Sequence, residues 1–246
     1  MAKVIAVANQ KGGVGKTTTS INLSSCVAYR NRKVLLIDLD PQGNTTTGLG
    51  IDKKNMELSI YDVIINETPL AEATISTIQE NLFICPSSMK LAGAEVELVS
   101  LLSRELRLKN AIDDVKDQYD YIFIDCPPSL GLLTLNALTG SDTVLVPIQC
   151  EYYALEGLTQ LMGTVSLVQK HLNKRLTVEG VVLTMFDART NLSIEVADEV
   201  KKYFSNKVYG TIIPRNIKLS EAPSYGLPIV LYDGKSKGLD ISAKGF

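Results

Sequence analysis

The sequence predicts an α/β fold in which one mostly parallel, twisted sheet carries helices on both faces. Two observations lead to this prediction. Apolar runs of strand length alternate with stretches of helical period along most of the chain, which is the pattern of parallel β-α-β units. No linker rich in proline, glycine or serine and no internal repeat divides the 246 residues, so we expect a single domain over 1–246.

The expected strands are short apolar runs, each followed by a loop or a helical stretch. In chain order they cover residues 3–8, 33–39, 82–85, 121–125, 143–148, 178–185 and 208–213.

The expected helices are marked by apolar residues at the 3.6-residue period. The clearest covers 155–172, where Leu155, Leu158 and Leu161 begin the stripe. Similar stripes predict helices near 95–115 and over 192–204. We interpret all of these stripes as core packing.

Composition excludes several classes of protein. Lys+Arg 25 against Asp+Glu 27 gives a net charge of -2, which does not favour a histone-like polyanion binder but permits a local basic patch. The cysteines Cys26, Cys85, Cys126 and Cys150 form no C-x-x-C pair, so we expect reduced core thiols in a cytoplasmic protein. A single histidine, His171, makes a histidine metal site or a Ser-His-Asp triad hard to build. No apolar stretch approaches the length of a membrane span, and we expect no membrane association.

A glycine-rich loop follows the first expected strand and precedes a helical stretch. Such a loop turns its backbone N–H groups around a phosphate, and the helix N-terminus adds partial positive charge. In this arrangement Lys16 reaches the β- and γ-phosphates and the Thr17 hydroxyl binds Mg²⁺. Gln10 occupies the first glycine position of G-x-x-x-x-G-K-[ST], and Lys11 stands inside the loop. The other expected nucleotide-binding residues are Gly12, Gly13, Val14, Gly15 and Thr18.

The loop sequence KGGVGKTT at residues 11–18 is the deviant Walker A motif. On this motif the chain resembles the ParA/MinD ATPases, specifically chromosomal ParA proteins of the Soj type, from residue 3 to about 238. The resemblance implies a P-loop NTPase-like fold, with ATP and Mg²⁺ as cofactors. It also implies that Lys11 crosses a dimer interface to the ATP of the other subunit. Independently, two lysines on one short loop repel each other unless an anion lies between them, by roughly 4 kcal/mol at about 4 Å and an effective dielectric of 20.

Two expected strands end in aspartates at the edge where the phosphate loop lies. Asp125 closes an apolar strand and fits the Walker B role of holding Mg²⁺ through a coordinated water. Cys126 follows it, so the adjacent glutamate that many P-loop ATPases use to activate water is missing. We therefore assign water activation to Asp40, on the loop after the second strand, in agreement with the family's switch I segment. Asp38 is expected on the Mg²⁺ side, in the second shell.

The resemblance also suggests where the base and DNA are bound. It places the loops at 182–187 and 212–216 beside the adenine, with Pro214, Arg215 and Asn216 near it. The resemblance also implies that Arg189 and Lys218 bind DNA without sequence preference. The alternative interpretation is that these two residues belong to a solvated basic face. Such binding rests on counterion release and should weaken steeply with salt.

The sequence thus predicts a ParA-type ATPase for chromosome or plasmid partitioning. Its ATP-dependent homodimer would bind DNA, associate with the nucleoid, and be reset by hydrolysis that a ParB-type partner stimulates. The alternatives are a MinD-like division-site ATPase and an ATP-dependent metabolic enzyme on the same scaffold, such as a dethiobiotin-type synthetase. Residues 239–246 form an atypical tail without a helical stripe.

Overall fold

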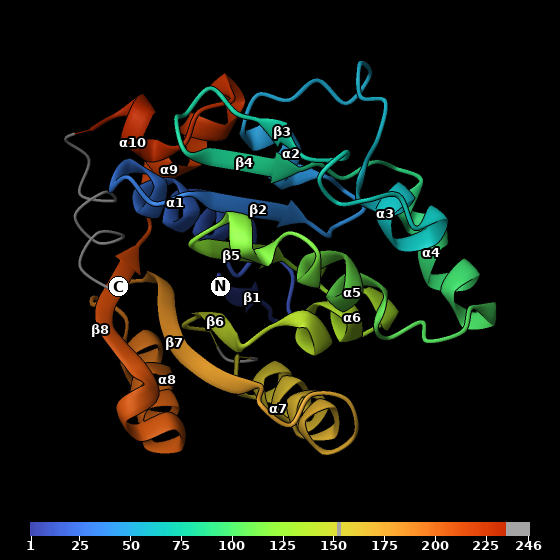
Figure 1. Cartoon of the computed structure of the whole chain (residues 1–246). Coiled ribbons are helices and arrows are strands. Elements are labelled where there is room, and N and C mark those ends of the chain that lie inside the picture. The colour runs from blue at the N-terminus through green and yellow to red at the C-terminus, as the bar shows by residue number, and fades with distance from the viewer. Residues whose placement is uncertain (152–153, 235–246) are drawn as a thin grey trace.

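The structure is a computed structural model, and it describes residues 1–151 and 154–234. The predicted tail at 239–246 lies outside the described residues. The predicted fold class is confirmed: one eight-stranded sheet has the order β3-β4-β2-β5-β1-β6-β7-β8, and helices cover both of its faces (Figure 1).

All strand pairings are parallel except that of β3 with β4. The seven strands predicted from apolar runs are present, and no strand end differs by more than one residue from its prediction. The antiparallel edge strand β3 was missed because it has two residues, both exposed. The strands are β1 (Lys3–Val7), β2 (Val34–Asp38), β3 (Ile75–Ser76), β4 (Leu82–Cys85), β5 (Tyr121–Asp125), β6 (Thr143–Gln149), β7 (Thr177–Phe186) and β8 (Val208–Pro214).

Two of the three predicted helices are confirmed, as α7 and α8, whereas the single helix predicted near 95–115 is wrong. There the chain forms α4, a short 3-10 turn and α5, and Ser103 between them has a φ of 51°. Leu98 and Leu108 are buried on either side of this break, so the apolar spacing comes from two elements. The helices are α1 (Lys16–Tyr29), α2 (Asn44–Gly48), α3 (Ile60–Asn66), α4 (Leu91–Glu97), α5 (Arg107–Asp113), α6 (Leu132–Gly140), α7 (Ala154–His171), α8 (Asn191–Phe204), α9 (Ile217–Glu221) and α10 (Ile229–Tyr232), with 3-10 turns at Leu98–Ser100, Lys116–Gln118, Ser205–Lys207 and Ala222–Tyr225.

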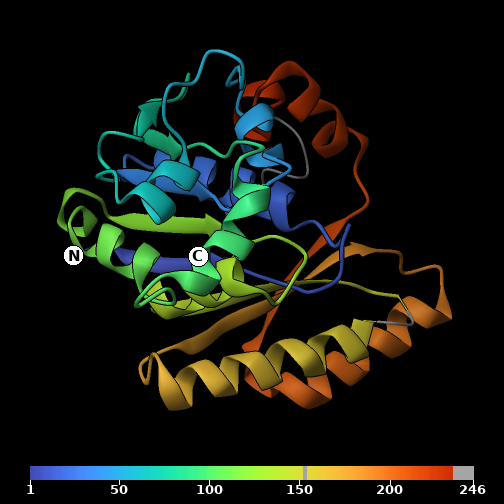
Figure 2. The ribbon, with the colours of Figure 1, turned by 90° about the vertical axis from the view of Figure 1, so that its right-hand side faces the viewer.

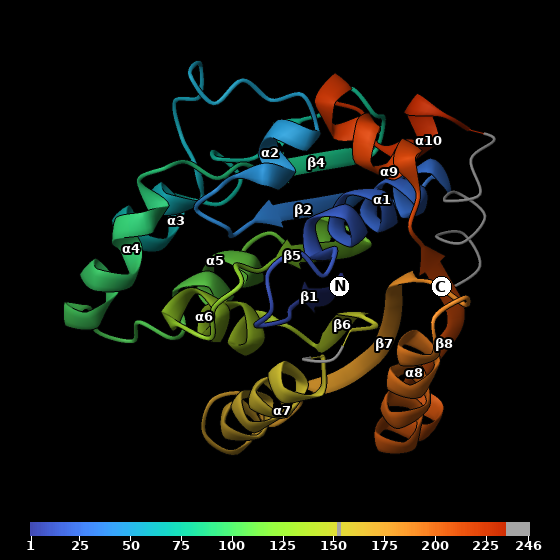
Figure 3. The same ribbon diagram turned by 180° about the vertical axis from the view of Figure 1, so that it is seen from behind.

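Two apolar clusters fill the space between the sheet and its helices. The larger joins the sheet to α3 through α8, and the smaller lies under α1, which packs across the central strands (Figure 3). The four cysteines are buried and free, as expected for core thiols. Within the described ranges, no helix has the length and apolar character that a transmembrane crossing requires.

The carboxyl ends of the central strands meet at one edge of the sheet. In Figure 1 the arrows of β2 and β4 point toward this edge, and Figure 2 looks onto it. In the register of the sheet Asp125 is paired with Val7 on one side and with Asp38 on the other. Parallel pairing therefore brings the ends of three strands, remote in sequence, to one place.

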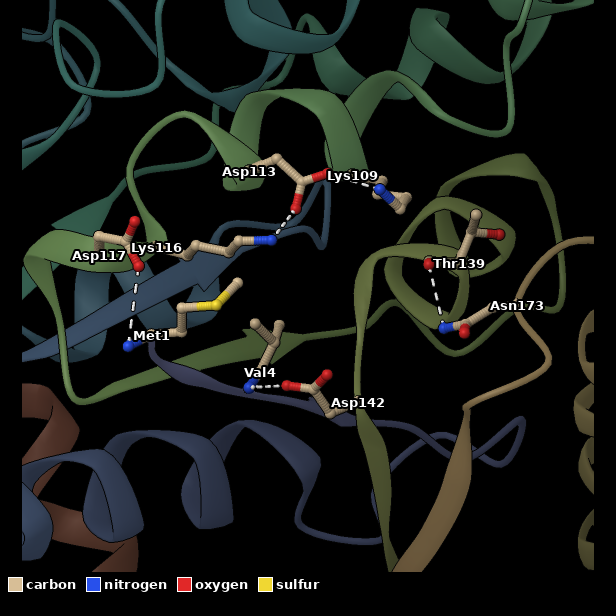
Figure 4. A network of polar contacts seen from close by, with 9 residues as sticks. All are labelled: Met1, Val4, Lys109, Asp113, Lys116, Asp117, Thr139, Asp142 and Asn173. Carbon is tan, nitrogen blue, oxygen red and sulfur yellow. Dashed lines mark hydrogen bonds and ion pairs between the residues drawn. The ribbon is translucent and has the colours of Figure 1, made fainter.

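The opposite, amino edge of the sheet is tied together by polar side chains (Figure 4). The Asp142 carboxylate accepts a hydrogen bond of 2.9 Å from the backbone N–H of Val4. The Asn173 side-chain amide donates to the carbonyls of Leu138, Thr139 and Ser141 at 3.2, 3.1 and 2.7 Å. These carbonyls lie at the C-terminus of α6, where the helix leaves acceptors without intrahelical partners.

We expect Asn173→Ala to lower the free energy of unfolding by about 1–3 kcal/mol, because it removes the donor that satisfies these carbonyls. Asn173→Asp should cost more, since it also places a carboxylate against a helix C-terminus. Urea denaturation measures both. Equal stability of the three proteins would contradict the role given to Asn173.

Candidate functional site

The loop between β1 and α1 leaves the N-terminus of α1 open. Gly13 and Gly15 have φ values of 75° and 87°, in the left-handed region that favours glycine. Gly15 is the N-cap of α1, no described side chain caps this helix, and its first turn carries no acidic residue. The first N–H groups of α1 are therefore available to an anion. The predicted residues 11–18 all lie on this loop and the first turn of α1.

Lys16 is buried under the same loop. Its ammonium Nζ donates to the backbone carbonyl of Lys11 at 3.0 Å. Burial lowers the pKa of Lys16, and this effect is opposed by the nearby Asp125, Cys126 and Asp40. Among the described residues the Lys11 carbonyl is the one hydrogen-bond acceptor of the Lys16 ammonium. A buried cation with so few acceptors is costly, so an anionic group of a ligand would be favoured beside it.

Asp125 lies at the end of β5 and is fully buried. Its Oδ2 accepts hydrogen bonds from the hydroxyls of Thr17 at 2.8 Å and Thr45 at 2.6 Å, and its Oδ1 accepts from Ser20 at 3.0 Å. Burial raises the pKa of Asp125, and the three hydroxyls and Lys16 counteract the rise. Hydroxyl and carboxylate oxygens are the ligands that Mg²⁺ prefers, so this donor set fits the expected ion.

Thr45 and Ser20 were not found from the sequence. The available signal for Thr45 was the run of three threonines at 45–47, directly after the expected switch loop. Ser20 stands one helical turn after Lys16, where a hydroxyl is unremarkable in sequence.

Asp38 lies beside Asp125 but bonds to a different threonine. Its Oδ2 accepts from the backbone N–H and the hydroxyl of Thr46, at 2.8 and 2.6 Å. Burial, followed by the charge of Asp125, raises the pKa of Asp38 to about 7. The pair Asp38 and Thr46 thus anchors α2 behind the Thr17–Asp125 contact.

Asp40 lies on the loop between β2 and α2, with its side chain mostly buried. It accepts a hydrogen bond from the backbone N–H of Gln42 at 2.9 Å. The ammonium of Lys53 donates to the Gln42 carbonyl and closes the outer side of this loop. The loop therefore stands at the same edge as Lys16 and Asp125, where a γ-phosphate would be exposed to attack.

A largely apolar cavity of about 290 Å³ adjoins the phosphate loop. Pro214, Arg215 and Asn216 line it from the end of β8, and Thr184 and Met185 line it from the end of β7. The two loops expected around the adenine thus border one cavity of a size near the lower limit for small-molecule sites. The sequence did not reveal that α1 supplies another wall, through Thr18, Thr19, Asn22 and Leu23.

The two basic residues expected to bind DNA are exposed and paired. Arg189 lies 2.7 Å from Asp187, and this contact lowers the pKa of Asp187 to about 2. Lys218 lies 3.1 Å from Glu221, with its ammonium 5.5 Å from the ring centre of Tyr232. A phosphate would therefore compete with a carboxylate at each position.

The family model described as AAA domain matches residues 2–178. The sporulation initiation inhibitor protein Soj of Bacillus subtilis (strain 168) is 61% identical over 241 residues, which are 98% of this chain and 95% of Soj. The chromosome partitioning protein ParA of Myxococcus xanthus (strain DK1622) is 52% identical over 98% of this chain and 85% of its own length.

Among solved structures, the chain is similar to a cobyrinic acid a,c-diamide synthase from Mycobacterium smegmatis with bound ATP analogue and magnesium. The TM-score is 0.88 at 37% sequence identity, and the match covers 99% of this chain and 92% of that one. In that synthase, a fold similar to that of this chain holds an ATP analogue together with magnesium.

The nucleotide-free chain should lose stability as the pH rises toward 7. Between the ordinary pKa of 3.8 and about 7, the folded chain binds a proton at Asp38 that the unfolded chain has released. The ionised carboxylate therefore destabilises the fold increasingly over this range. We expect Asp38→Asn, which removes the charge, to be more stable than the wild type at pH 8 by up to about 4 kcal/mol, with the difference vanishing near pH 4.

Urea unfolding in the presence of a chelator, at pH values from 4 to 8, measures this difference. Asp198→Asn, an exposed change on α8, is the control and should not show this pH dependence. A stability difference between wild type and Asp38→Asn that stays constant with pH would contradict the assignment.

Proposed function

We propose that this chain, which belongs to the ParA family of chromosome-partitioning ATPases, closes into an ATP-dependent dimer that binds DNA and is released by hydrolysis. The observation that carries the proposal is the meeting of an uncapped helix N-terminus, the buried Lys16 and the Thr17–Asp125 pair at one sheet edge, beside a cavity of nucleoside size.

Each part of this edge has a task in ATP hydrolysis. The N–H groups of the loop and of α1 bind the phosphates, and Lys16 leaves the Lys11 carbonyl to neutralise the γ-phosphoryl group. Thr17 and Asp125 would hold Mg²⁺, which when bound would supply charge neutralisation on the phosphates. Asp40 orients the attacking water. Asp125 and Asp38 accept hydrogen bonds from Thr45 and Thr46, whereas Asp40, on the loop between β2 and α2, accepts from the backbone N–H of Gln42.

The dimer supplies the remaining cation. Lys11 and Gly12 lie at the outer side of the loop, and Gly12 is exposed. A second copy meeting this surface would bring its own Lys11 to the phosphates, which spreads the charge of the triphosphate over lysines of both subunits. Two nucleotides would then be enclosed between the two copies.

Dimerisation doubles any basic surface near the site. Arg189 and Lys218 stand on the segments that border the cavity, at the ends of β7 and β8. DNA binding without sequence preference, association with the nucleoid and stimulation by a ParB-type partner complete the proposed cycle. Because phosphate binding by these cations releases counterions from DNA, affinity for DNA should fall strongly as salt rises. Asp187 and Glu221 compete with the phosphates for Arg189 and Lys218.

A metabolic synthase is the second candidate, favoured by the structural likeness to the cobyrinic acid a,c-diamide synthase at 37% identity. The likeness to Soj, at 61% identity over nearly the whole chain, supports the partitioning function more strongly. A MinD-like division-site ATPase is the third. In a sedimentation assay we expect the partitioning ATPase to sediment with DNA, the division-site ATPase with anionic liposomes, and the metabolic synthase with neither.

We expect Asp40→Ala to lower the rate of ATP hydrolysis by about 100-fold or more, because the water loses its orienting carboxylate. The variant should remain a dimer with ATP and sediment with DNA, whereas the wild type does so only until its ATP is consumed. Gel filtration with ATP and with ADP, followed by sedimentation across a salt series, provides the measurement.

Asp52→Ala is the matched control, since Asp52 is an exposed aspartate beyond the same loop. An unchanged hydrolysis rate in Asp40→Ala would remove Asp40 from the mechanism. Sedimentation with liposomes alone would favour the division-site alternative.

We expect Gly12→Val to remain folded and to bind ATP but not to dimerise. A Cβ at Gly12 meets no atom within 4 Å in the single chain, and this residue lacks a positive φ, so the added bulk acts only against a second copy. Gly13→Val is the contrasting control, because Gly13 has a φ of +75° and its substitution strains the loop itself. Thermal unfolding, nucleotide titration and sedimentation velocity separate the two effects, and an ATP-dependent dimer of Gly12→Val would contradict the proposed interface.

A further inference from the structure

Lys11 is already paired within its own chain. Its ammonium Nζ lies 3.0 Å from Oε2 of Glu151, which follows the end of β6. The side chain of Lys11 is 27% exposed and that of Glu151 is 49% exposed, so the pair is partly shielded from solvent. The other carboxylate oxygen, Oε1, accepts a hydrogen bond from the amide of Gln149, which fixes the orientation of Glu151.

The backbone around Lys11 is held to the same strand. The side-chain amide of Asn9 donates to the carbonyl of Pro147 on β6 at 2.7 Å, and its Oδ1 accepts from the backbone N–H of Lys11 at 3.0 Å. The carbonyl of Lys11 accepts from Lys16 at 3.0 Å. Residue 11 is therefore held at its N–H, its carbonyl and its ammonium in the nucleotide-free chain.

We propose that Glu151 is a positioning residue that retains Lys11 in its own subunit and so sets the ATP concentration at which two copies close. This inference rests on the proposed function, because Lys11 must leave Glu151 before it can reach the phosphates of a second copy. Closure exchanges a Lys11–carboxylate pair for a Lys11–triphosphate pair in each subunit.

The Lys11–Glu151 pair is weak enough to raise the ATP concentration needed for dimerisation without preventing dimerisation. Partly exposed ion pairs contribute little individually, and a triphosphate with several charges competes better for an ammonium than one carboxylate does. A nucleotide lacking the γ-phosphoryl group offers less charge, so Glu151 helps to keep the ADP-bound chain monomeric. Since each dimer breaks two such pairs, removing Glu151 should lower the dimer dissociation constant by about 2- to 30-fold.

The variant that tests this is Glu151→Gln, which keeps the size of the side chain and removes its charge. We expect tighter dimers with a non-hydrolysable ATP analogue and Mg²⁺, and half-maximal dimerisation at a lower analogue concentration. Glu151→Asp keeps the charge on a shorter side chain, and its dimer dissociation constant should lie between those of the wild type and Glu151→Gln. The difference in dimer dissociation constant between the wild type and Glu151→Gln should become smaller as the salt concentration rises, because salt screens exposed ion pairs. Sedimentation velocity measures all three proteins.

Glu199→Gln is the matched control, since the side chain of Glu199 is 51% exposed, close to the 49% of Glu151, and pairs with Lys202 on the same helix α8. It should leave the dissociation constant unchanged. The pair itself is tested without nucleotide, by the rate at which an amine-reactive reagent labels Lys11. This rate should rise in Glu151→Gln, because the carboxylate no longer covers the ammonium.

Three results would count against the inference. An unchanged labelling rate would show that the pair does not form, and faster labelling with an unchanged dissociation constant would show that it does not control closure. Weaker dimers in Glu151→Gln would show that the Glu151 carboxylate stabilises the dimer instead of opposing its formation. A wild type that stays monomeric with the analogue, whatever its labelling rate, would overturn the proposed function itself.

Discussion

The arrangement of the site depends on one buried carboxylate. Asp125 is fully buried at the carboxyl end of a central strand, where desolvation opposes its charge. It is tolerated because Thr17, Ser20 and Thr45 donate to it and Lys16 lies nearby. Two of these hydroxyls come from α1 and one from α2, so satisfying Asp125 fixes the phosphate loop relative to the switch segment.

The need of a charged group for a polar partner also explains how Lys11 and Lys16 coexist on one loop without a polyanion between them. Each has an acceptor of its own, the Lys11 carbonyl for Lys16 and the Glu151 carboxylate for Lys11. Their ammonium groups therefore do not share an acceptor. A nucleotide that binds here replaces acceptors that already exist, and its affinity reflects a difference between two sets of contacts.

The sequence predicted what is encoded locally and the aspartates at the strand ends, but it missed partners that other strands bring to the glycine-rich loop. Strands, α7, α8 and the glycine loop follow from apolar spacing and from residues that stand next to one another. Glu151 and Thr45 are remote from the loop in sequence, and only the strand order β2-β5-β1-β6 brings them to it. The helix predicted near 95–115 failed for a different reason: Leu98 and Leu108 are both buried in the larger apolar cluster, and an apolar period does not reveal a break in the helix between them.

The segment after β8 connects the apolar cavity beside the glycine-rich loop with the region of α2. Asn216 and Leu219 line the cavity, and further along this segment Gly226 packs so closely on Gly50 that a Cβ there would lie 2.6 Å from the Gly50 Cα. The N–H of Ile229 donates to Asn22 on α1 at 2.7 Å, and Asn22 also lines the cavity. Close backbone contact leaves no room for the segment to move alone, because packed interiors resist compression. This segment carries Lys218, and it therefore contacts both the apolar cavity and the region of α2, whose Thr45 donates to Asp125.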